Sequence, residues 1–218
     1  EIMKSQDIGL LFKLISLHKQ EAGPAVDNIN KSWPMDWQDW DSELDDEHLG
    51  AKSSQTAPSE YLASRYTARS LEESLGISKS QINLSLNRCL DIGLIRTDRK
   101  TGLPRTNTRA LIEFIVYGIK YVFPTKPGSL TRGIATAFAA PVLNEKLFTA
   151  GELILVWPYA RGNTKGQTLE PLFKSTPYAV KRDPEMYAML ALTDAIRVGK
   201  PREANLAADF LNKRLSLN

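Results

Sequence analysis

The chain of 218 residues has one cysteine and two histidines. A lone Cys89 excludes an internal disulfide framework, and His18 and His48 do not show the spacing of a metal site. No candidate nucleophile lies beside a candidate base in the sequence. We therefore expect a protein that is not an enzyme and that needs no metal or other cofactor.

Long apolar runs are also missing. No segment approaches the roughly 18 consecutive apolar residues of a transmembrane helix, and the first residues do not combine a charged start with an apolar stretch, as a secretory leader would. The composition, 42% hydrophobic and 24% charged, is typical of a soluble globular chain with a substantial core. We expect a cytoplasmic protein that does not enter a membrane.

The charged residues are distributed unevenly. Residues 27–47 contain eight acidic residues and one lysine, a net charge of −7, and because the whole chain carries +3, the remainder carries +10. A basic body is typical of proteins that bind a polyanion, although a solvated basic surface has the same composition. The acidic residues form one charge run, which favours a solvated face over a cation site.

Three of the four tryptophans lie in this acidic segment. Ser32 can cap a helix with Pro34 in its first turn, and Trp33, Trp37 and Trp40 would then share one face. Such a helix can dock on its own domain, or it can bind a partner protein, because buried aromatic residues dominate the energetics of interfaces. A third possibility is that its acidic face competes with a polyanion for the basic body.

Two helices are predicted before the middle of the chain. Residues 7–20 form an amphipathic pattern, and a second helix runs from a cap at Thr67 to Leu75, where Gly76 ends it. The residues expected to face inward on the first helix are Ile8, Leu11, Phe12, Ile15 and either Leu17 or His18.

A third helix is predicted over residues 78–92. Ser78 and Gln81 have the spacing of a capping box, and Ile77 with Ile82 that of a hydrophobic staple. The expected core stripe consists of Ile82, Leu86, Cys89 and Ile92. The opposite face carries amides, hydroxyls and one guanidinium, on Ser80, Gln81, Asn83, Leu84, Asn87 and Arg88. Amides pair with adenine, arginine with guanine, and an apolar side chain packs on a thymine methyl, so this face is suited to DNA base edges.

A short basic hairpin is predicted next. Leu94 and Ile95 start a strand, residues 100–102 make the turn, and Thr106 or Asn107 caps the helix that follows. Only Asp98 opposes the basic residues of this segment, which are Arg96, Arg99, Lys100, Arg105 and Arg109.

The segment TARSLEESLGISKSQINLSLNRCLDIGLIRTDRKTG resembles the DNA-binding core of bacterial winged-helix transcriptional regulators of the MarR-like kind. The resemblance covers roughly residues 67–109, with 8–18 as a plausible first helix. It implies that the 78–92 helix lies in the major groove and that the hairpin contacts phosphates or the minor groove. The implied DNA-binding residues are Ser78, Ser80, Gln81, Asn83, Leu84, Asn87, Arg88, Arg96, Arg99, Lys100 and Arg105. Winged helices also serve as protein–protein modules, and this alternative stays open.

Residues 108–123 are apolar on nearly every side, so we expect them to be buried all round. They form the hinge between the two halves of the chain, a subunit interface or a core helix of the monomer. Regulators of the kind that the chain resembles are usually two-fold dimers, which implies a homodimer.

Residues 124–218 carry no motif for an activity. LILVWPY is a predicted strand, and RGNTKGQT is a predicted surface loop because it lacks the spacing of a phosphate-binding loop. Asp183 and Pro184 start a helix that ends before Gly199, and a last helix begins at Pro201, so the two form a helical hairpin. This half is open to an effector, a partner or a second copy of the chain.

The sequence therefore predicts a mainly α fold with small β content (α+β). A winged helix-turn-helix domain spans residues 3–123 with the acidic, tryptophan-containing insert at about 24–58, and an α-rich region with a short strand spans 124–218. The predicted function is sequence-specific binding of double-stranded DNA by a dimeric repressor. The alternative is a winged-helix adaptor that binds another protein.

Overall fold

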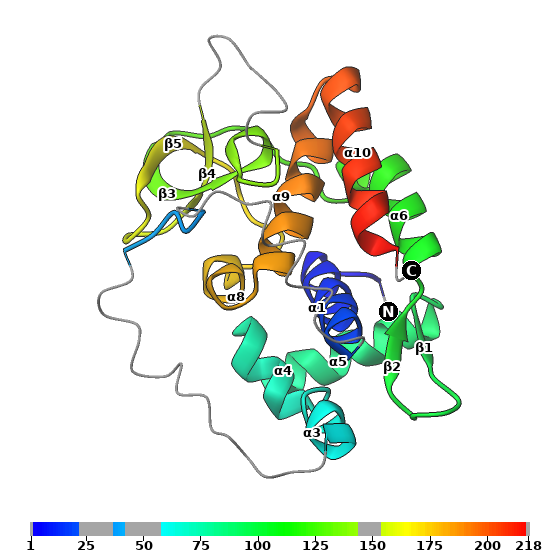
Figure 1. Ribbon diagram of the computed structural model, residues 1–218. Helices are drawn as coiled ribbons and strands as arrows, with labels where there is room; N and C mark the ends of the chain where they lie inside the picture. The colour runs from blue at the N-terminus through cyan, green and yellow to red at the C-terminus, as the bar shows by residue number, and fades with distance from the viewer. Residues whose placement is uncertain (1, 22–36, 42–57, 144–153, 217–218) are drawn as a thin grey trace.

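The computed structural model describes residues 2–21, 37–41, 58–143 and 154–216. These residues are mainly helical, with a few short strands in two small sheets, so the predicted fold class is confirmed. Helix α1 (Ser5–Glu21) and helix α9 (Pro184–Val198) pack side by side in the middle of the molecule (Figure 1). No helix in the described ranges is both long and apolar enough to cross a membrane.

The two central helices are buried on nearly every side. Residues 7–17 of α1 and 185–196 of α9 are all buried, whereas the sequence predicted a one-sided stripe for α1. Alanines at positions 188, 191 and 195 of α9 are fully buried and let neighbouring elements approach closely. The other helices and both sheets are arranged around this pair.

Paired charges fix α1 against α9. Lys13 Nζ lies 2.9 Å from Asp183 Oδ2, and Lys19 Nζ lies 2.8 Å from Glu185 Oε1. Asp183 also caps α9 as predicted, because its Oδ1 accepts hydrogen bonds from the first backbone N–H groups of the helix. A buried charge without a partner is strongly destabilising, so these pairs define how the two helices meet. Helix α10 (Pro201–Leu215) packs on α9 and completes the predicted helical hairpin.

Below α1 in Figure 1 lie α3 (Pro58–Ser64), α4 (Ala68–Leu75) and α5 (Lys79–Asp91). Thr67 caps α4, since its Oγ1 accepts a hydrogen bond from Ser70 N at 3.2 Å. Strands β1 (Ile95–Thr97) and β2 (Pro104–Thr106) then form an antiparallel hairpin, with Arg96 opposite Arg105. The predicted succession of helix, turn, helix and hairpin is therefore present.

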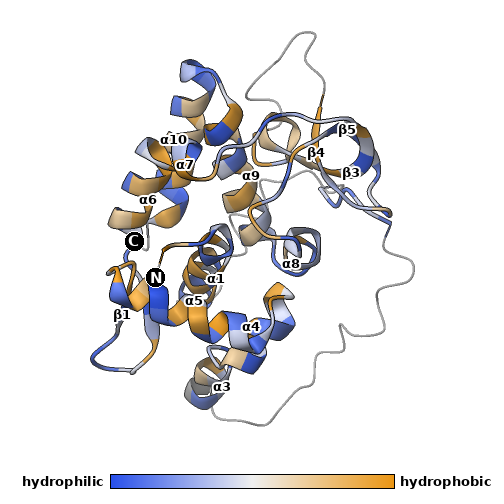
Figure 2. Ribbon diagram, turned by 180° about the vertical axis from the view of Figure 1, so that it is seen from behind, coloured by the Kyte–Doolittle hydropathy of each residue, from blue (hydrophilic) through white to orange (hydrophobic). Residues whose placement is uncertain are grey.

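The segment expected to be buried all round is instead one-sided. It forms α6 (Thr108–Tyr117), capped by Asn107 as predicted, and a short α7 (Ile119–Val122). Residues 111, 115 and 119 are fully buried, but Tyr117 and Tyr121 are 76% and 73% exposed. The expectation of burial on every side is wrong because α9 and α10 cover only one side of α6. Figure 2 shows apolar and polar residues interleaved along α6.

The second half contains more strand than the sequence predicted. Strands β3 (Leu130–Thr136), β4 (Leu155–Pro158) and β5 (Thr164–Thr168) each pair with the other two, so the unit closes on itself. Strand β4 confirms the prediction for LILVWPY, but part of RGNTKGQT is β5 and not a loop. A Cβ on Gly133 would lie 2.0 Å from the carbonyl oxygen of Trp157, so this closure requires glycine. The short η2 (Ala137–Ala139), which follows β3, packs on α9, and α8 (Thr176–Arg182) lies between β5 and α9 in the chain.

The described part of the acidic segment, residues 37–41, is not helical. Trp40 forms a β-bridge with Gly162, and Asp39 Oδ2 accepts hydrogen bonds from Ala135 N at 2.7 Å and Thr164 Oγ1 at 2.6 Å. The predicted tryptophan helix is wrong here because the backbone pairs with the β3–β5 unit instead of with itself. Trp33 and the predicted cap at residues 32–34 lie outside the described residues.

Trp37 and Trp40 pack against their own chain. Their ring centroids lie 5.5 Å apart, and Tyr187 of α9 lies 6.2 Å from Trp37 and 6.3 Å from Trp40. Trp40 is 7% exposed, so the prediction that it binds a partner protein is wrong. Of the alternatives given for this segment, docking on its own chain holds for Trp40. Tyr187 of α9, which also contacts Trp157 of β4, offers an aromatic surface that the sequence alone did not reveal.

The buried apolar residues form one cluster. It includes Leu11 of α1, Ile82 of α5, Trp157 of β4 and Leu211 of α10, and therefore extends across the expected domain boundary at residue 123. The placement of α5 and of the hairpin consequently depends on contacts from both halves of the chain.

Candidate nucleic-acid interface

Helix α5 has a buried face and an exposed polar face. Ile82 and Cys89 are fully buried, as the predicted stripe requires, but Ile92 is 48% exposed because the helix already ends at Asp91. Ser85, which was not part of the predicted stripe, also lies on the buried face. Among the predicted DNA-binding residues of this helix and its cap, the exposed ones are Ser78, Ser80, Asn83, Leu84 and Asn87, and the structure adds Lys79.

The start of α5 differs from the predicted capping box. Ser78 occupies the N-cap position, but its side chain makes no capping hydrogen bond. Glu72 of α4 instead accepts a hydrogen bond from Lys79 N at 3.1 Å. Gln81 Oε1 accepts one from Gln6 Nε2 of α1 at 3.0 Å, so the Gln81 side chain faces α1 and is partly buried. The Ser78–Gln81 box does not form, because the Gln81 side chain is hydrogen-bonded to Gln6 of α1, while Glu72 of α4 accepts from the N–H of Lys79.

Arg88 is not a DNA-binding residue in this structure. Its side chain is 1% exposed, and its guanidinium makes two hydrogen bonds to Asp7 of α1, from Nη2 to Oδ1 at 2.6 Å and from Nε to Oδ2 at 3.0 Å. Ser85 Oγ donates to the same carboxylate at 2.6 Å. Helical periodicity placed Arg88 at the border of the polar face, and the buried carboxylate of Asp7 draws it inward. Arg88 therefore fixes α5 against α1.

The sequence held one signal of this contact. Asp7 is an acidic residue directly before a run of apolar residues, and a buried carboxylate requires a cation or several hydrogen-bond donors. The partner was not recognisable, because Arg88 is 81 positions away. Cys89 lies in the same environment, where burial first and the charge of Asp7 second raise the pKa of its thiol to about 12.

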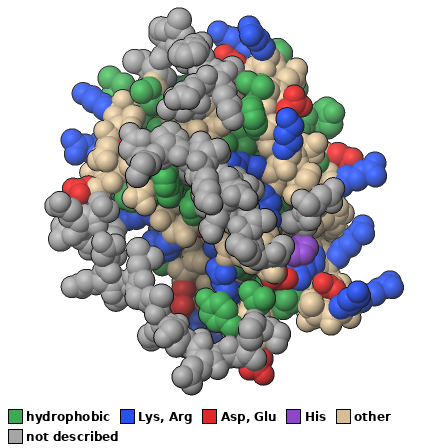
Figure 3. Space-filling view, in the orientation of Figure 1, with side chains coloured by type: hydrophobic (Ala, Val, Ile, Leu, Met, Phe, Trp, Pro, Cys, Tyr) green, Lys and Arg blue, Asp and Glu red, His purple; other side chains and the backbone are tan. Residues whose placement is uncertain are grey.

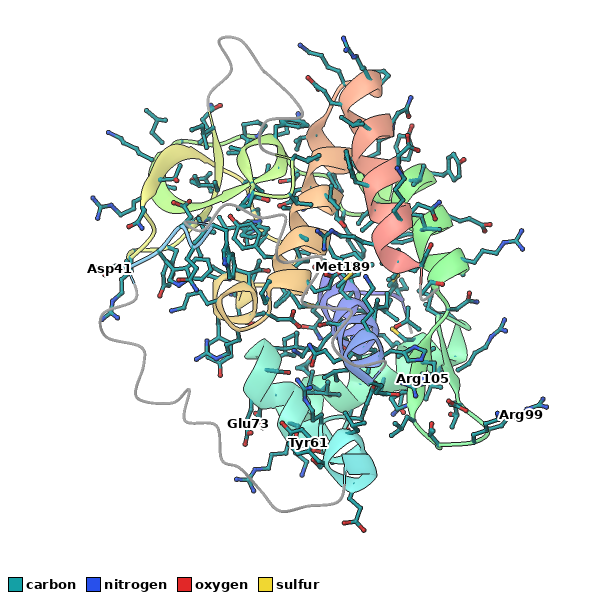
Figure 4. The ribbon with its side chains drawn as sticks, in the orientation of Figure 1. Asp41, Tyr61, Glu73, Arg99, Arg105 and Met189 are labelled. Atoms are coloured by element: carbon teal, nitrogen blue, oxygen red, sulfur yellow. The ribbon has the colours of Figure 1, made fainter. Side chains whose placement is uncertain are left out.

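The hairpin carries exposed cations on β1 and at its tip. Arg96, Arg99 and Lys100 are exposed, and none of them forms an ion pair with a residue that the structure describes. Figure 3 shows Lys and Arg side chains projecting at the edge of the molecule where the hairpin lies in Figure 1. In Figure 4 the side chain of Arg99 points away from the body, whereas Arg105 lies close to it.

Arg105 is engaged inside the protein, so its expected contact with phosphates is wrong. Its Nη1 and Nη2 atoms each lie 2.8 Å from a carboxylate oxygen of Glu21, and Nη1 also donates to Tyr66 Oη at 2.9 Å. Asp98 lies 3.5 Å from its Nε. These contacts attach the base of the hairpin to the end of α1 and to the residue before the cap of α4. Arg105 is therefore a positioning residue.

This cluster shifts the protonation of its members. Burial raises the pKa of Glu21, but hydrogen bonds from Arg105 and Tyr66 outweigh it, and the pKa lies below its ordinary value of 4.5. Burial, followed by the charge of Arg105, lowers the pKa of His18 below 6.5. At neutral pH the cluster thus holds the carboxylates of Glu21 and Asp98, the guanidinium of Arg105 and a neutral imidazole. Both carboxylates pair with Arg105, and Arg96, Arg99 and Lys100 form no ion pair with a described residue.

Comparisons of the chain with models of protein families, with curated proteins and with solved structures found no match. The chemistry of the surface therefore carries the functional argument. We call the exposed residues of α5 and of the hairpin the α5–hairpin surface; it consists of Ser78, Lys79, Ser80, Asn83, Leu84, Asn87, Arg96, Arg99 and Lys100.

The α5–hairpin surface offers hydrogen-bonding groups and cations but few groups for catalysis. Its side chains are hydroxyls, amides, ammonium and guanidinium groups, with one apolar residue. Within the described ranges, no three His, Cys, Asp or Glu side chains are grouped so that they could hold a metal ion. Such a surface can bind phosphates through its cations and can form paired hydrogen bonds with base edges through its amides.

Proposed function

We propose that α1, α4, α5 and the β1–β2 hairpin act as a winged helix-turn-helix that binds double-stranded DNA in a sequence-specific manner. In this proposal α5 lies in the major groove, and the hairpin contacts the phosphate backbone beside it. The protein would act as a regulator of transcription, as a repressor that blocks a promoter.

One observation carries the proposal. The exposed face of α5 presents Asn83 and Asn87 one helical turn apart, without the Glu and Lys pairs usual on a solvated helix. The adjacent hairpin carries Arg99, which points away from the body in Figure 4, and the exposed Lys100. Asparagine can form two hydrogen bonds with adenine, and exposed cations release counterions from phosphates. The loss of Arg88 and Arg105 from the predicted set reduces the number of cations but leaves this division of roles intact.

The experiment separates phosphate contacts from base contacts. The double variant Arg99→Ala/Lys100→Ala should flatten the slope of log affinity against log salt by about 1.8 per subunit, since each phosphate contact contributes roughly 0.9. Fluorescence anisotropy with labelled duplexes over a salt series measures this slope. The matched control, Lys165→Ala/Lys213→Ala, removes two exposed lysines from β5 and α10 and should leave the slope unchanged.

Base contacts predict a different signature. Asn83→Ala and Asn87→Ala should each weaken binding to the preferred duplex by about 1–3 kcal/mol and hardly affect scrambled DNA. The preferred duplex is first selected from a random library. If the wild type binds no duplex at low salt, or if the hairpin and α5 variants bind like the wild type, the DNA-binding proposal is wrong.

A homodimer is part of the proposal, because two-fold operators are bound by two-fold proteins. The exposed aromatic residues Tyr117 and Tyr121, together with Val122, which is 50% exposed, form a candidate contact on α6 and α7. Light scattering at micromolar concentration should give twice the mass of the chain, and Tyr117→Ser/Tyr121→Ser should give the monomer mass. A monomeric wild type would contradict this part of the proposal.

A protein–protein adaptor is the second candidate. It is favoured by two exposed leucines of α5, Leu84 and Leu90, which are 40% and 42% exposed. Exposed leucines on a helix are typical of a surface that docks on another protein. Leu84→Ser should weaken such docking strongly, whereas in the DNA-binding proposal it removes at most one contact with a thymine methyl.

A further inference from the structure

The β3–β5 unit and the segments on either side of it are strongly basic. Residues 124–143 and 154–182 contain a single acidic residue, Glu170, against seven basic ones, which are Lys126, Arg132, Arg161, Lys165, Lys174, Lys181 and Arg182. Figure 3 shows Lys and Arg side chains projecting at the edge of the molecule where this unit lies in Figure 1. A surface with such an excess of positive charge attracts a polyanion.

Two of these cations are placed side by side by the strand register. Arg132 of β3 is directly opposite Lys165 of β5. Side chains of directly opposite residues lie on the same face with their Cβ atoms about 4.5–5.5 Å apart, and like charges there are destabilising. Both side chains are exposed, and neither forms an ion pair with a residue that the structure describes. An anion in contact with both cations would turn this repulsion into attraction.

The same face also carries an exposed apolar side chain. Leu130 is two positions from Arg132 on β3, so the two share a face of the strand, and Leu130 is 57% exposed. We call this surface the β3–β5 outer face; it consists of Leu130, Arg132 and Lys165. A ligand that covers all of it needs an apolar group beside its negative charges.

The aromatic rings near this face are covered by cations on one side. Tyr159 N donates to Arg132 O at 3.1 Å, and Lys181 Nζ lies 4.9 Å from the centroid of the Tyr159 ring and donates to its Oη at 2.7 Å. Arg182 lies in the same way over Tyr178, 3.5 Å from the ring centroid. Proteins that bind single-stranded nucleic acids stack bases on free aromatic faces. The arrangement therefore favours an acidic polypeptide, whose apolar side chains can cover Leu130, over a nucleic acid.

The β3–β5 unit already holds an acidic segment of its own chain. Trp40 pairs with Gly162, and the carboxylate of Asp39 accepts hydrogen bonds from Ala135 N and Thr164 Oγ1. Thr164 and Lys165 are neighbours on β5, so their side chains point to opposite faces of the strand. Residues 37–41 are thus bound on the other side of β5, and the outer face is left exposed.

We propose that the β3–β5 outer face binds an acidic segment of another protein, in which Glu or Asp residues are interspersed with apolar residues. Arg132 and Lys165 bind neighbouring carboxylates, and Leu130 packs against an apolar side chain of the segment. The β3–β5 unit and the β1–β2 hairpin lie at opposite ends of the molecule (Figures 1 and 2). The bound segment does not need the α5–hairpin surface, so this inference is independent of the proposed DNA binding.

The probe is a fluorescently labelled peptide of eight glutamates and four leucines, titrated with the full chain at low salt and followed by anisotropy. Arg132→Gln/Lys165→Gln should bind it about fivefold more weakly, as expected for the loss of two solvent-exposed ion pairs. Arg202→Gln/Lys213→Gln removes one exposed arginine and one exposed lysine from α10, and this matched control should bind like the wild type.

The apolar contact is tested separately. Leu130→Ser should weaken binding of the peptide about threefold, because less apolar surface is covered in the complex. It should not change the affinity for a second peptide in which serines replace the four leucines. Equal effects of Leu130→Ser on the two peptides would show that Leu130 makes no apolar contact with the segment, and this part of the proposal would be wrong.

Other outcomes would overturn the proposal as a whole. One is that the peptide does not bind, or that it binds both double variants alike. A second is that the oligonucleotide dT9, which carries eight phosphates, binds more tightly than the peptide and loses as much affinity in Arg132→Gln/Lys165→Gln, which would identify the ligand as a nucleic acid. A third is that this variant lowers the mass of the chain in light scattering, because the occupant is then a second copy.

Thermal melting tests the argument from repulsion. Arg132→Gln/Lys165→Gln removes two like charges that lie opposite each other, so it should melt at or above the temperature of the wild type. A lower melting temperature would show that the two cations stabilise the fold and are not held ready for a ligand.

Discussion

Arg88 provides the sharpest test of how α5 is placed. Its guanidinium and the carboxylate of Asp7 are 1% and 0% exposed, and they meet in a two-point contact at 2.6 and 3.0 Å. Replacing Arg88 by Met keeps most of the volume but leaves a buried carboxylate without its cation. The loss of one partner of a buried pair destabilises a protein by about 3–5 kcal/mol.

The structure indicates where in this range the loss falls. After Arg88→Met the Asp7 carboxylate keeps two donors, Ser85 Oγ at 2.6 Å and Lys4 N at 2.8 Å, so it is not left without hydrogen bonds. We therefore expect about 3 kcal/mol, the lower end of the range. For a chain of this size the melting temperature should fall by about 10 °C.

A double-mutant cycle isolates the pair. Asp7→Asn retains hydrogen-bonding groups for Ser85 and Lys4, so Asp7→Asn/Arg88→Met removes both charges with little change in shape. The double variant should lose at least about 1 kcal/mol less than the sum of the two single variants. Urea unfolding followed by circular dichroism measures the four free energies. Arg96→Met, at an exposed position on β1, is the control and should change stability by less than about 0.5 kcal/mol.

The result that would refute the argument is specific. If Arg88→Met melts like the wild type and also loses preference for the selected duplex, then Arg88 contacts bases and its burial against Asp7 is wrong. If the melting temperature falls while the preference of the folded protein survives at low temperature, the positioning role stands.

Three further predictions concern other buried groups. Trp40→Ala should destabilise the protein by about 3 kcal/mol, because a nearly buried indole packed on Tyr187 is lost; unchanged thermal melting would mean that Trp40 does not pack there. Cys89, whose thiol pKa is raised to about 12, should not react with a thiol reagent at pH 8 until urea unfolds the protein, and rapid reaction of the native protein would contradict its burial. The lowered pKa of His18 stabilises the fold above pH 6.5, and this contribution is lost as the pH falls through the folded pKa. Between pH 7 and pH 5 the wild type should therefore lose more unfolding free energy than His18→Gln, and equal losses would show that His18 is solvated.

Local signals in the sequence predicted the helical elements well. The caps at Thr67, Asn107 and Asp183 all accept hydrogen bonds from the first turns of their helices. These signals act over three or four residues, so neighbouring sequence contains everything they need. The capping box at Ser78 failed because a residue from outside the segment is involved: Gln6 of α1 is hydrogen-bonded to the Gln81 side chain, which is then not available to Ser78 N.

Long-range pairing was much harder to predict. The backbone of residues 37–41 pairs near Gly162, more than 120 positions away, and nothing within the acidic segment marks that partner. Strand β5 contains Gly and polar residues and lacks the alternation of a typical strand, so its sequence indicated a loop. Backbone pairing with β3 and β4 makes this segment a strand, although its side chains do not have the pattern of a strand.

The candidate site was predicted in part, and the errors have one cause. Helical periodicity assigns a residue to a face of the helix. A cationic side chain at the border of that face, however, can turn toward a buried carboxylate of another element and pair with it. Arg88 turns to Asp7, and Arg105 turns to Glu21, whereas Arg99 at the tip of the hairpin has no acidic partner among the described residues. Both carboxylates belong to α1, which the sequence presented as a plain amphipathic helix.

The position of the α5–hairpin surface is therefore determined by α1 and, through it, by the second half of the chain. Asp7 near the start of α1 holds α5, and Glu21 at its end holds the hairpin. Between them Lys13 and Lys19 pair with Asp183 and Glu185 at the beginning of α9. Sliding α9 along α1 without moving α1 would break these buried ion pairs, which is costly, so the packing of α9 fixes α1 and, through α1, both parts of the surface. Residues 124–218 thus have a defined mechanical role, which is to hold the helix that places α5 and the hairpin.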